Sequence, residues 1–369
     1  MGQRFRFAVI SDPHIALPET IWDAPNRFHL VEVSIPALEQ ILAHLVTLDL
    51  DFLLMPGDLT QHGERVNHQW LAQRLSELPF PVYVVPGNHD VIARDGQGAA
   101  IAFDEFAQIH QEFGYWDGKT PYYLAQPLPG VQVVGLNSNV FADDGALLPM
   151  GHLDEIQLAW LDDILPTLQG DLVLVMLHHN VLEHVPGQAK SPLGRRYLLQ
   201  NHRALRQRLE QAGVRLLFTG HLHVQDVARQ GGLCEVLTGS LVSYPHPYRV
   251  LEVERRDDGQ LTVDIQSQHL ASVPGWPNLK EYSYSWMCDR SLPFMVKFLS
   301  SPPLSLPLAE AEALAPSLKH FWATIAAGDP HFDFSHLPPA SRRLLERFST
   351  TDSEGNPQRL DNTATLVLP

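Results

Sequence analysis

Carboxylate, amide and imidazole side chains recur in five short blocks of this 369-residue sequence. The blocks are DPH at 12–14, GD at 57–58, GNHD at 87–90, HH at 178–179 and GHLH at 220–223. Such side chains, without thiolates, are typical ligands of borderline and harder divalent metals such as Mn, Fe, Zn and Co. The two cysteines have no metal-binding spacing. The blocks therefore predict a metal centre with oxygen and nitrogen ligands.

Together, the blocks supply more ligand-type side chains than one ion needs. They are Asp12, His14, Asp58, Asn88, His89, His178, His221 and His223. Two ions that share a bridging carboxylate would use this set economically. Asp58 is the natural bridge, because each of its two oxygens can face one ion. Gly57 before it lets the backbone approach closely.

Each block follows a short apolar run, which predicts that buried strands position the polar residues. The runs are residues 5–10, 51–55, 81–85, 171–177 and 214–219. Their Val, Leu, Ile and Phe content is typical of strands covered on both faces. Ligands bind beyond the carboxyl ends of such strands, so we expect the five blocks to gather at one rim. Turn chemistry alone would not select the histidines.

Helical patterns separate several of these runs. Apolar residues recur at helical spacing over 35–48, 67–78, 156–168 and 201–212. The alternation of strand and helix predicts an α/β fold with parallel or mixed strands.

Composition favours a globular protein whose partners are small molecules. The net charge is −16 and the hydrophobic fraction is 44%. An acidic surface disfavours nucleic acid polymers and anionic membranes. No apolar run is long enough for a transmembrane segment, and Arg4 and Arg6 interrupt the start of the chain too early for a signal peptide. Two cysteines fit a reducing compartment, so we expect a cytoplasmic protein.

The five blocks, in this order, resemble the calcineurin-like metallophosphoesterase superfamily. The resemblance covers roughly residues 5–255 and implies a four-layer αββα sandwich of two mixed sheets. It also implies two ligand sets. The first metal would be held by Asp12, His14, Asp58 and His223, and the second by Asp58, Asn88, His178 and His221. His89 would be a histidine that faces the scissile group without binding metal.

The fourth block departs from the family pattern. Members often read His-His-Pro or His-x-Pro, whereas this chain has Asn180 at the proline position. By that register we take His178 as the ligand and place His179 beside it or on the substrate side. The two assignments could be exchanged.

Longer segments are similar to the class III cyclic nucleotide phosphodiesterase branch, which includes glycerophosphodiesterases. They are GDLTQHGE at 57–64, PVYVVPGNHD at 81–90, LDEIQLAWLDDIL at 153–165 and GSLVSYPHPYRVLEVE at 239–254. The resemblance implies a phosphodiesterase with two transition-metal ions (Mn, Fe or Zn) and a small diester substrate such as 3',5'-cyclic AMP. Metal-activated hydroxide would attack phosphorus, and His89, oriented by Asp90, would protonate the leaving group or stabilise the transition-state charge.

Two alternatives stay open at this stage. The same site could serve a phosphomonoesterase or a glycerophosphodiester or phospholipid hydrolase. A scaffold without metal chemistry would be expected to have lost ligands, and here the set is intact.

The sequence changes character after about residue 270. Pro, Gly and aromatic residues at 272–286 indicate a linker or a wrapping segment, and helical patterns follow at 308–327 and 339–348. We predict a catalytic domain at 1–270 and a partly helical C-terminal extension at 271–369. The extension would pack on the domain, shape the mouth of the site or mediate homodimer formation.

Overall fold

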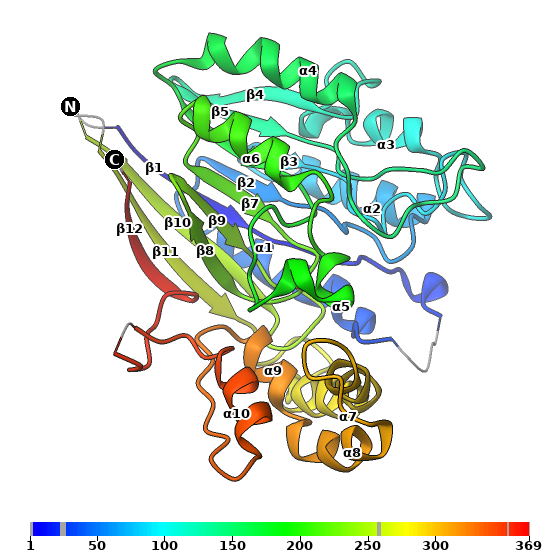
Figure 1. The fold of residues 1–369 in the computed structure, drawn as a ribbon. Coiled ribbons are helices and arrows are strands. Elements are labelled where there is room, and N and C mark those ends of the chain that lie inside the picture. Colours follow the sequence, from blue (N-terminus) through cyan, green and yellow to red (C-terminus); the bar gives the residue numbers. More distant parts are fainter. Residues whose placement is uncertain (1–2, 23–26, 257–259, 353, 369) are drawn as a thin grey trace.

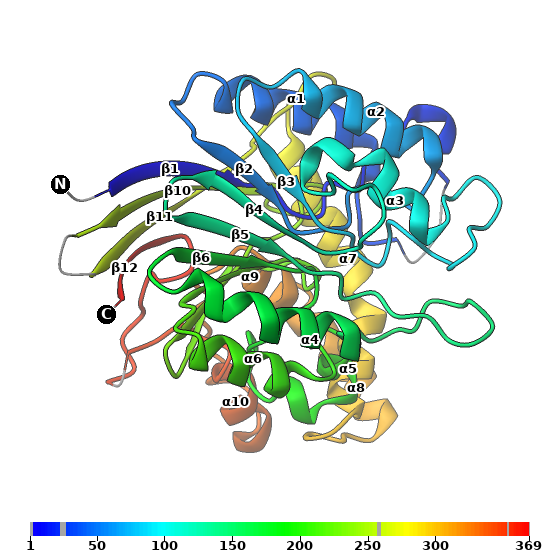
Figure 2. The ribbon, with the colours of Figure 1, turned by 90° about the horizontal axis from the view of Figure 1, so that it is seen from above.

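The computed structural model describes residues 3–22, 27–256, 260–352 and 354–368. Within them, two six-stranded mixed sheets lie face to face between two layers of helices (Figures 1 and 2). The strand orders are β12-β11-β10-β1-β2-β3 and β4-β5-β6-β7-β9-β8. The predicted α/β sandwich of four layers is confirmed.

The first sheet joins a parallel half to an antiparallel half. Its parallel strands are β1 Gln3–Val9, β2 Phe52–Met55 and β3 Val82–Val84. Its antiparallel strands are β10 Pro247–Arg255, β11 Leu261–His269 and β12 Thr363–Leu368. The end of the chain thus returns to this sheet as an edge strand.

The second sheet has a parallel centre and antiparallel edges. The parallel strands are β5 Val131–Gly135, β6 Leu172–Met176, β7 Leu216–Thr219 and β9 Leu233–Leu237. The edges are β4 Tyr123–Leu128 and β8 Asp226–Gln230. All five predicted strand segments are therefore strands, namely β1, β2, β3, β6 and β7.

Helices cover the outer face of each sheet (Figure 2). The first sheet is covered by α1 Ser34–Leu45, α2 Arg65–Ser76 and α3 Phe103–Ile109, and the second by α4 Glu155–Ile164 and α6 His202–Gln211. The short α5 spans Pro192–Arg195. Short 3-10 helices occupy Pro18–Thr20, Val31–Val33, Gln111–Phe113, Leu165–Leu168, Gln188–Lys190 and Ala315–Leu318.

An aromatic cluster joins the two sheets. Phe7 of β1 stacks on Phe52 of β2 with ring centroids 4.8 Å apart, and it meets Phe218 of β7 edge to face at 5.4 Å. All three side chains are fully buried. Burying each ring stabilises the fold by about 1.5–3 kcal/mol, so the strand ends that follow them are held on a rigid base.

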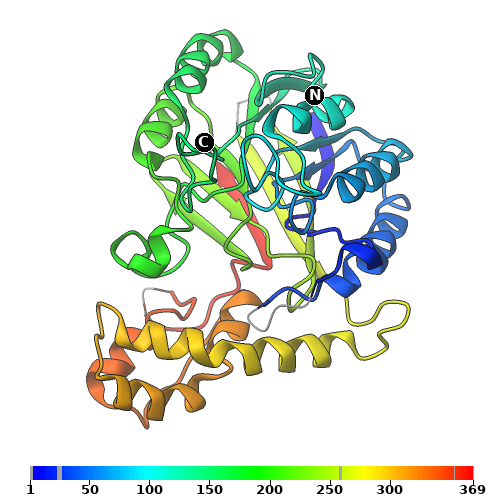
Figure 3. The same ribbon diagram turned by 90° about the vertical axis from the view of Figure 1, so that its right-hand side faces the viewer.

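The C-terminal extension forms a helical layer against one end of the sandwich (Figure 3). Its helices are α7 Leu279–Ser300, α8 Leu308–Leu314, α9 Phe321–Ala326 and α10 Pro339–Glu346. Of the two interpretations of residues 272–286, a linker or a wrapping segment, the linker is wrong from Leu279 onward, where α7 begins. Buried residues recur every four positions along α7 and form one ridge of the helix. This ridge includes Ser283 and Ser291, and Pro293 lies inside the helix, so the sequence shows only a weak apolar pattern for it.

No helix within the described part of the chain has the length and apolarity needed to cross a membrane.

Candidate metal centre

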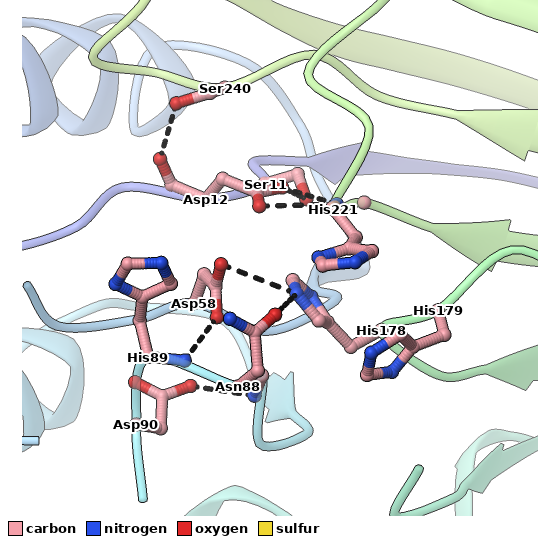
Figure 4. Close-up of polar contacts among 12 residues, drawn as sticks. Ser11, Asp12, Asp58, Asn88, His89, Asp90, His178, His179, His221 and Ser240 are labelled. Carbon is pink, nitrogen blue, oxygen red and sulfur yellow. Dashed lines mark hydrogen bonds and ion pairs between the residues drawn. The ribbon is translucent and has the colours of Figure 1, made fainter. Parts of the chain in front are cut away.

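The loops that follow five strands bring the predicted site residues together. Figure 4 shows six of them, namely Asp12, Asp58, Asn88, His89, His178 and His221. Asp12 and His14 follow β1, Asp58 follows β2, Asn88 and His89 follow β3, His178 follows β6, and His221 and His223 follow β7.

Asp12, His14, Asp58 and His223 form the first cluster. One donor atom from each lies within 4.8 Å of the other three. Nε2 of His223 is 3.1 Å from Oδ1 of Asp12 and 3.4 Å from Nε2 of His14. Asp12, His14 and Asp58 are buried. Buried carboxylates this close to imidazoles are expected where they are paired or coordinate a metal.

Asp58, His178 and His221 form the second cluster, again with donor atoms within 4.8 Å of one another. Nε2 of His178 lies 3.3 Å from Oδ2 of Asp58 and 3.2 Å from Oδ1 of Asn88 (Figure 4). Asn88 therefore joins this cluster. Asp58 belongs to both clusters, as a bridging carboxylate must.

Backbone carbonyls fix the orientation of two of the imidazoles. Nδ1 of His178 donates to the Pro56 carbonyl at 2.9 Å, and Nδ1 of His89 donates to the Gln61 carbonyl at 2.7 Å. A carbonyl only accepts, so Nδ1 carries the hydrogen in both rings. In each ring Nε2 is then the nitrogen left free of the backbone, which at the predicted ligand His178 is the arrangement typical of metal-bound histidines.

Burial and neighbouring charges set the protonation of the ligand-type histidines. Burial holds the pKa of His14 and of His221 well below the usual range. Burial also opposes protonation of His178, but the Asp58 carboxylate outweighs it and raises the pKa of His178 to about 9. Neutral imidazoles are ready to bind a metal, and at His178 a cation would displace the proton beside Asp58.

The prediction that Asp90 orients His89 is wrong. The buried Asp90 carboxylate instead accepts from the backbone N–H groups of Leu59 at 3.0 Å, Thr60 at 2.9 Å and Gly87 at 2.8 Å. Asp90 therefore ties the loop after β2 to the loop after β3. That tie fixes the distance between Asp58 and Asn88.

The ligand loops have unusual backbone conformations. Among the described residues, eight other than glycine have positive φ, and five of these are predicted ligands: Asp12, His14, Asp58, His221 and His223. This region is uncommon for residues with a side chain, and such strain concentrates at functional sites. The surrounding fold thus holds these side chains in place at a cost in stability.

Gly87 allows the loops after β2 and β3 to touch. A Cβ atom at this position would overlap the backbone nitrogen and Oδ1 of Asp58. We expect Gly87→Ala to displace Asp58, to reduce metal content and to destabilise the protein by about 1–3 kcal/mol, as overpacking does. Elemental analysis and thermal melting would measure both effects. Gly232→Ala is the matched control, because its Cβ would meet no atom within 4 Å. Equal metal content in the two variants would contradict the expectation.

The fourth block separates its two histidines. His178 lies in the second cluster, whereas Nδ1 of His179 is 2.8 Å from Oγ of Ser138. This geometry favours His178 as the ligand, which stays a prediction. Asn180 donates from Nδ2 to the Gly220 carbonyl at 3.0 Å and to Oγ1 of Thr219 at 3.2 Å. It thus joins the loops after β6 and β7, which a proline could not do with its side chain.

The sequence-based prediction missed residues that border the centre. His29 follows no strand, yet its ring centroid is 4.1 Å from that of His14 and 4.7 Å from that of His223. A cavity of about 170 Å³ adjoins the centre. Its lining includes Asp58, Asn88, His89, His221 and His223, together with His29, Arg196 and the extension residues Met287, Phe294 and Trp322. The helical extension therefore forms one wall of the site.

The family model of the calcineurin-like phosphoesterases matches residues 5–225 of this chain. The chain belongs to this family. Its buried cluster of Asp and His side chains could bind the metals on which the family depends.

Several relatives are phosphodiesterases by name. A 3',5'-cyclic-nucleotide phosphodiesterase of Nostoc sp. is 30% identical over 186 residues, which are 49% of this chain and 59% of that protein. A probable glycerophosphodiester phosphodiesterase GpdQ of Arcobacter nitrofigilis is 27% identical over 172 residues, 46% of this chain and 55% of that one. This chain thus spans little more than half the length of these relatives.

One solved structure supports the fold alone. A dimetal phosphatase from Danio rerio is 17% identical and has a TM-score of 0.52, with coverage of 72% of this chain and 96% of that one.

Proposed function

We propose that this protein is a dinuclear metal-dependent phosphodiesterase that hydrolyses a small diester, with 3',5'-cyclic AMP as the first candidate. The observation that carries the proposal is that Asp58 belongs to both donor clusters. The names of the relatives from Nostoc sp. and Arcobacter nitrofigilis support a diester substrate.

The residues present fit two ions of Mn, Fe or Zn. The donors are carboxylate, amide and imidazole groups without thiolate, which suits these metals. Asp12, His14, Asp58 and His223 would hold the first ion, and Asp58, Asn88, His178 and His221 the second. When bound, such a pair makes a water nucleophilic near neutral pH and offsets charge on the phosphoryl oxygens.

His89 would supply the proton that the leaving group needs. The Gln61 carbonyl holds Nδ1–H, and His89 lines the cavity beside the two clusters. When protonated, Nε2 would donate its proton to the leaving oxygen as the bond from phosphorus to that oxygen breaks. His89 has no ligand role in this proposal.

The extension would shape the space for the organic group of the substrate. Met287, Phe294 and Trp322 present an apolar wall, and Arg196 contributes a cation to the same cavity. A phosphate ester with an apolar or aromatic substituent fits this combination of charge and surface. The division into a domain at 1–270 and an extension at 271–369 stays a prediction, as do a homodimer and a cytoplasmic location.

An activity panel on the metal-reconstituted protein tests the proposed function. The substrates are 3',5'-cyclic AMP, a glycerophosphodiester, bis(p-nitrophenyl) phosphate and p-nitrophenyl phosphate. We expect the diesters to be hydrolysed faster than the monoester. Faster hydrolysis of the monoester would favour the phosphomonoesterase alternative, and the glycerophosphodiester as best substrate would favour the glycerophosphodiesterase alternative. No hydrolysis of any substrate by fully metallated protein would overturn the proposal.

The wall formed by the extension should affect substrate binding more than chemistry. We expect Phe294→Ala and Trp322→Ala to raise KM for a preferred diester by about 10-fold, because each change removes apolar contact worth roughly 1–3 kcal/mol. Metal content should not change, and kcat should stay within a few-fold. Steady-state kinetics on two diesters of different substituent would measure the effect. Leu308→Ala, on an exposed side chain of α8, is the control. An unchanged KM in both wall variants would contradict this role.

A further inference from the structure

His29 lies beside the first donor cluster without belonging to any of the five blocks. One donor atom each from His14, His29 and His223 lies within 4.8 Å of the other two. His14 and His223 are also members of the first cluster. An ion that binds these two residues would therefore have His29 as its next nitrogen donor.

The three rings bring ring nitrogens close together, with Nε2 of His14 3.4 Å from Nε2 of His223. Neutral imidazoles each present an unprotonated nitrogen that can only accept, and buried acceptors without a donor cost free energy. The ring centroid of His89 is also near, 5.5 Å from that of His29. An ion among the rings would accept one lone pair from each of them.

Two anchors fix the short segment that carries His29. Its following residue, Leu30, donates its backbone N–H to the Val242 carbonyl at 2.8 Å. The preceding residue, Phe28, accepts from Nε1 of Trp286 on α7 at 3.2 Å. Arg290 lies over the Trp286 ring, with its guanidinium carbon 3.1 Å from the ring centroid. The helical extension therefore helps to hold His29 at the centre.

We propose that His29 is a fifth protein ligand of the first metal ion and that α7 holds it in place through the hydrogen bond from Trp286 to Phe28. Two nitrogens bound to one ion at about 2.0–2.1 Å lie at most about 4.2 Å apart. The three donor atoms, which lie within 4.8 Å of one another, would therefore move closer together when an ion binds. This inference rests on the dinuclear centre proposed above. It extends that centre by a ligand from outside the strand ends.

Metal binding tests the inference independently of activity. Metal-free wild type, His29→Ala, His29→Phe and Trp286→Phe are titrated calorimetrically with Mn²⁺. The visible spectrum of each protein is recorded after Co²⁺ loading, because the absorption of Co²⁺ reports its coordination number. Thermal melting of the metal-free proteins establishes that each is folded. His336→Ala, in the exposed part of the extension, is the control histidine variant.

We expect wild type to bind two ions and His29→Ala to weaken one site by about 10–100-fold, the range seen when groups that support a metal are removed. The Co²⁺ spectrum of that site should change, and the other site should keep its affinity. His29→Phe retains a ring for packing but has no donor nitrogen, so it should behave like His29→Ala. Trp286→Phe keeps the aromatic ring without its N–H donor, so we expect a smaller loss at the same site.

Two results would overturn the role of His29. One is wild-type affinity and spectrum in His29→Phe, because a packing role alone predicts that result. The other is equal weakening of both sites in His29→Ala. A wild-type protein that binds fewer than two ions would instead overturn the dinuclear centre and the inference with it.

Discussion

Asp58→Asn is expected to lose tight binding at both metal positions and to lower kcat by on the order of 10³-fold or more. Oδ2 of Asp58 lies 3.7 Å from Nε2 of His14 in one cluster and 3.3 Å from Nε2 of His178 in the other. Oδ1 accepts from the His89 backbone N–H at 2.8 Å. The same oxygen, Oδ2, thus faces both clusters. Asparagine has nearly the same size but no charge, so its neutral amide oxygen would hold two cations far more weakly than the carboxylate.

Elemental analysis after Mn²⁺ loading and gel filtration would measure the loss. Wild type should approach two ions per chain, and the variant should fall well below. Asp163→Asn removes the same charge from an exposed position on α4 and should retain both ions and full turnover. Two ions per chain in Asp58→Asn would contradict the bridging role, as would a wild-type plateau at one ion that the substitution leaves unchanged.

The fold of the sandwich could be predicted because its signals are local. A buried strand such as β2 is a continuous apolar run, and the residues that follow it mark where it ends. Parallel strands bring their carboxyl ends to the same rim, so Asp58 and His178 could be expected as neighbours although 120 residues separate them.

Other features could not be predicted because they depend on contacts distant in sequence. The polar side chains of Ser283 and Ser291 lie on the buried ridge of α7. They are buried because another part of the chain packs against them, which their residue types do not indicate. β12 pairs with β11 although about 100 residues separate the two strands. Exposed and buried residues alternate along β12, but this alternation does not tell which strand it pairs with. The position of His29 depends on the contact between Phe28 and Trp286.

The extension and the ligand loops also share a hydrophobic cluster. Leu222 lies between the two histidines of the GHLH block and packs in a cluster with Met295 and Phe321 of the extension. The left-handed conformations of His221 and His223 cost stability, and burial of Leu222 between them offsets part of that cost. The helical layer thus supports the same loop from which two predicted ligands project.

His89→Ala is expected to lower kcat by about 10²–10⁴-fold while both metal positions keep their affinity, as the loss of an acid–base group should. The side chain of His89 binds the Gln61 carbonyl through Nδ1, and the contact of this residue with Asp58 is made by its backbone N–H. Alanine keeps that backbone N–H. The bridging carboxylate should therefore keep its position.

The size of the loss should depend on the leaving group, which separates proton donation from a merely structural effect. A diester with an alkyl leaving group needs the proton and should show the full loss. A p-nitrophenyl leaving group departs readily as the p-nitrophenolate anion without a proton. The hydrolysis rate of a diester with this leaving group should therefore fall much less. Measurement of kcat for both diesters, with wild type and His336→Ala as references, gives the comparison.

Two outcomes would contradict this role for His89. Loss of one ion per chain would mean that His89 is a ligand and not a proton donor. An equal loss of rate with both leaving groups, at full metal content, would mean that His89 stabilises charge on the phosphoryl oxygens, because that charge develops whichever group departs. The proton would then have to come from another group at the rim. His14 has the ring nearest to His89, at 4.7 Å between centroids, but it is a predicted ligand, so the candidate is His62, whose ring centroid is 5.2 Å from that of His89.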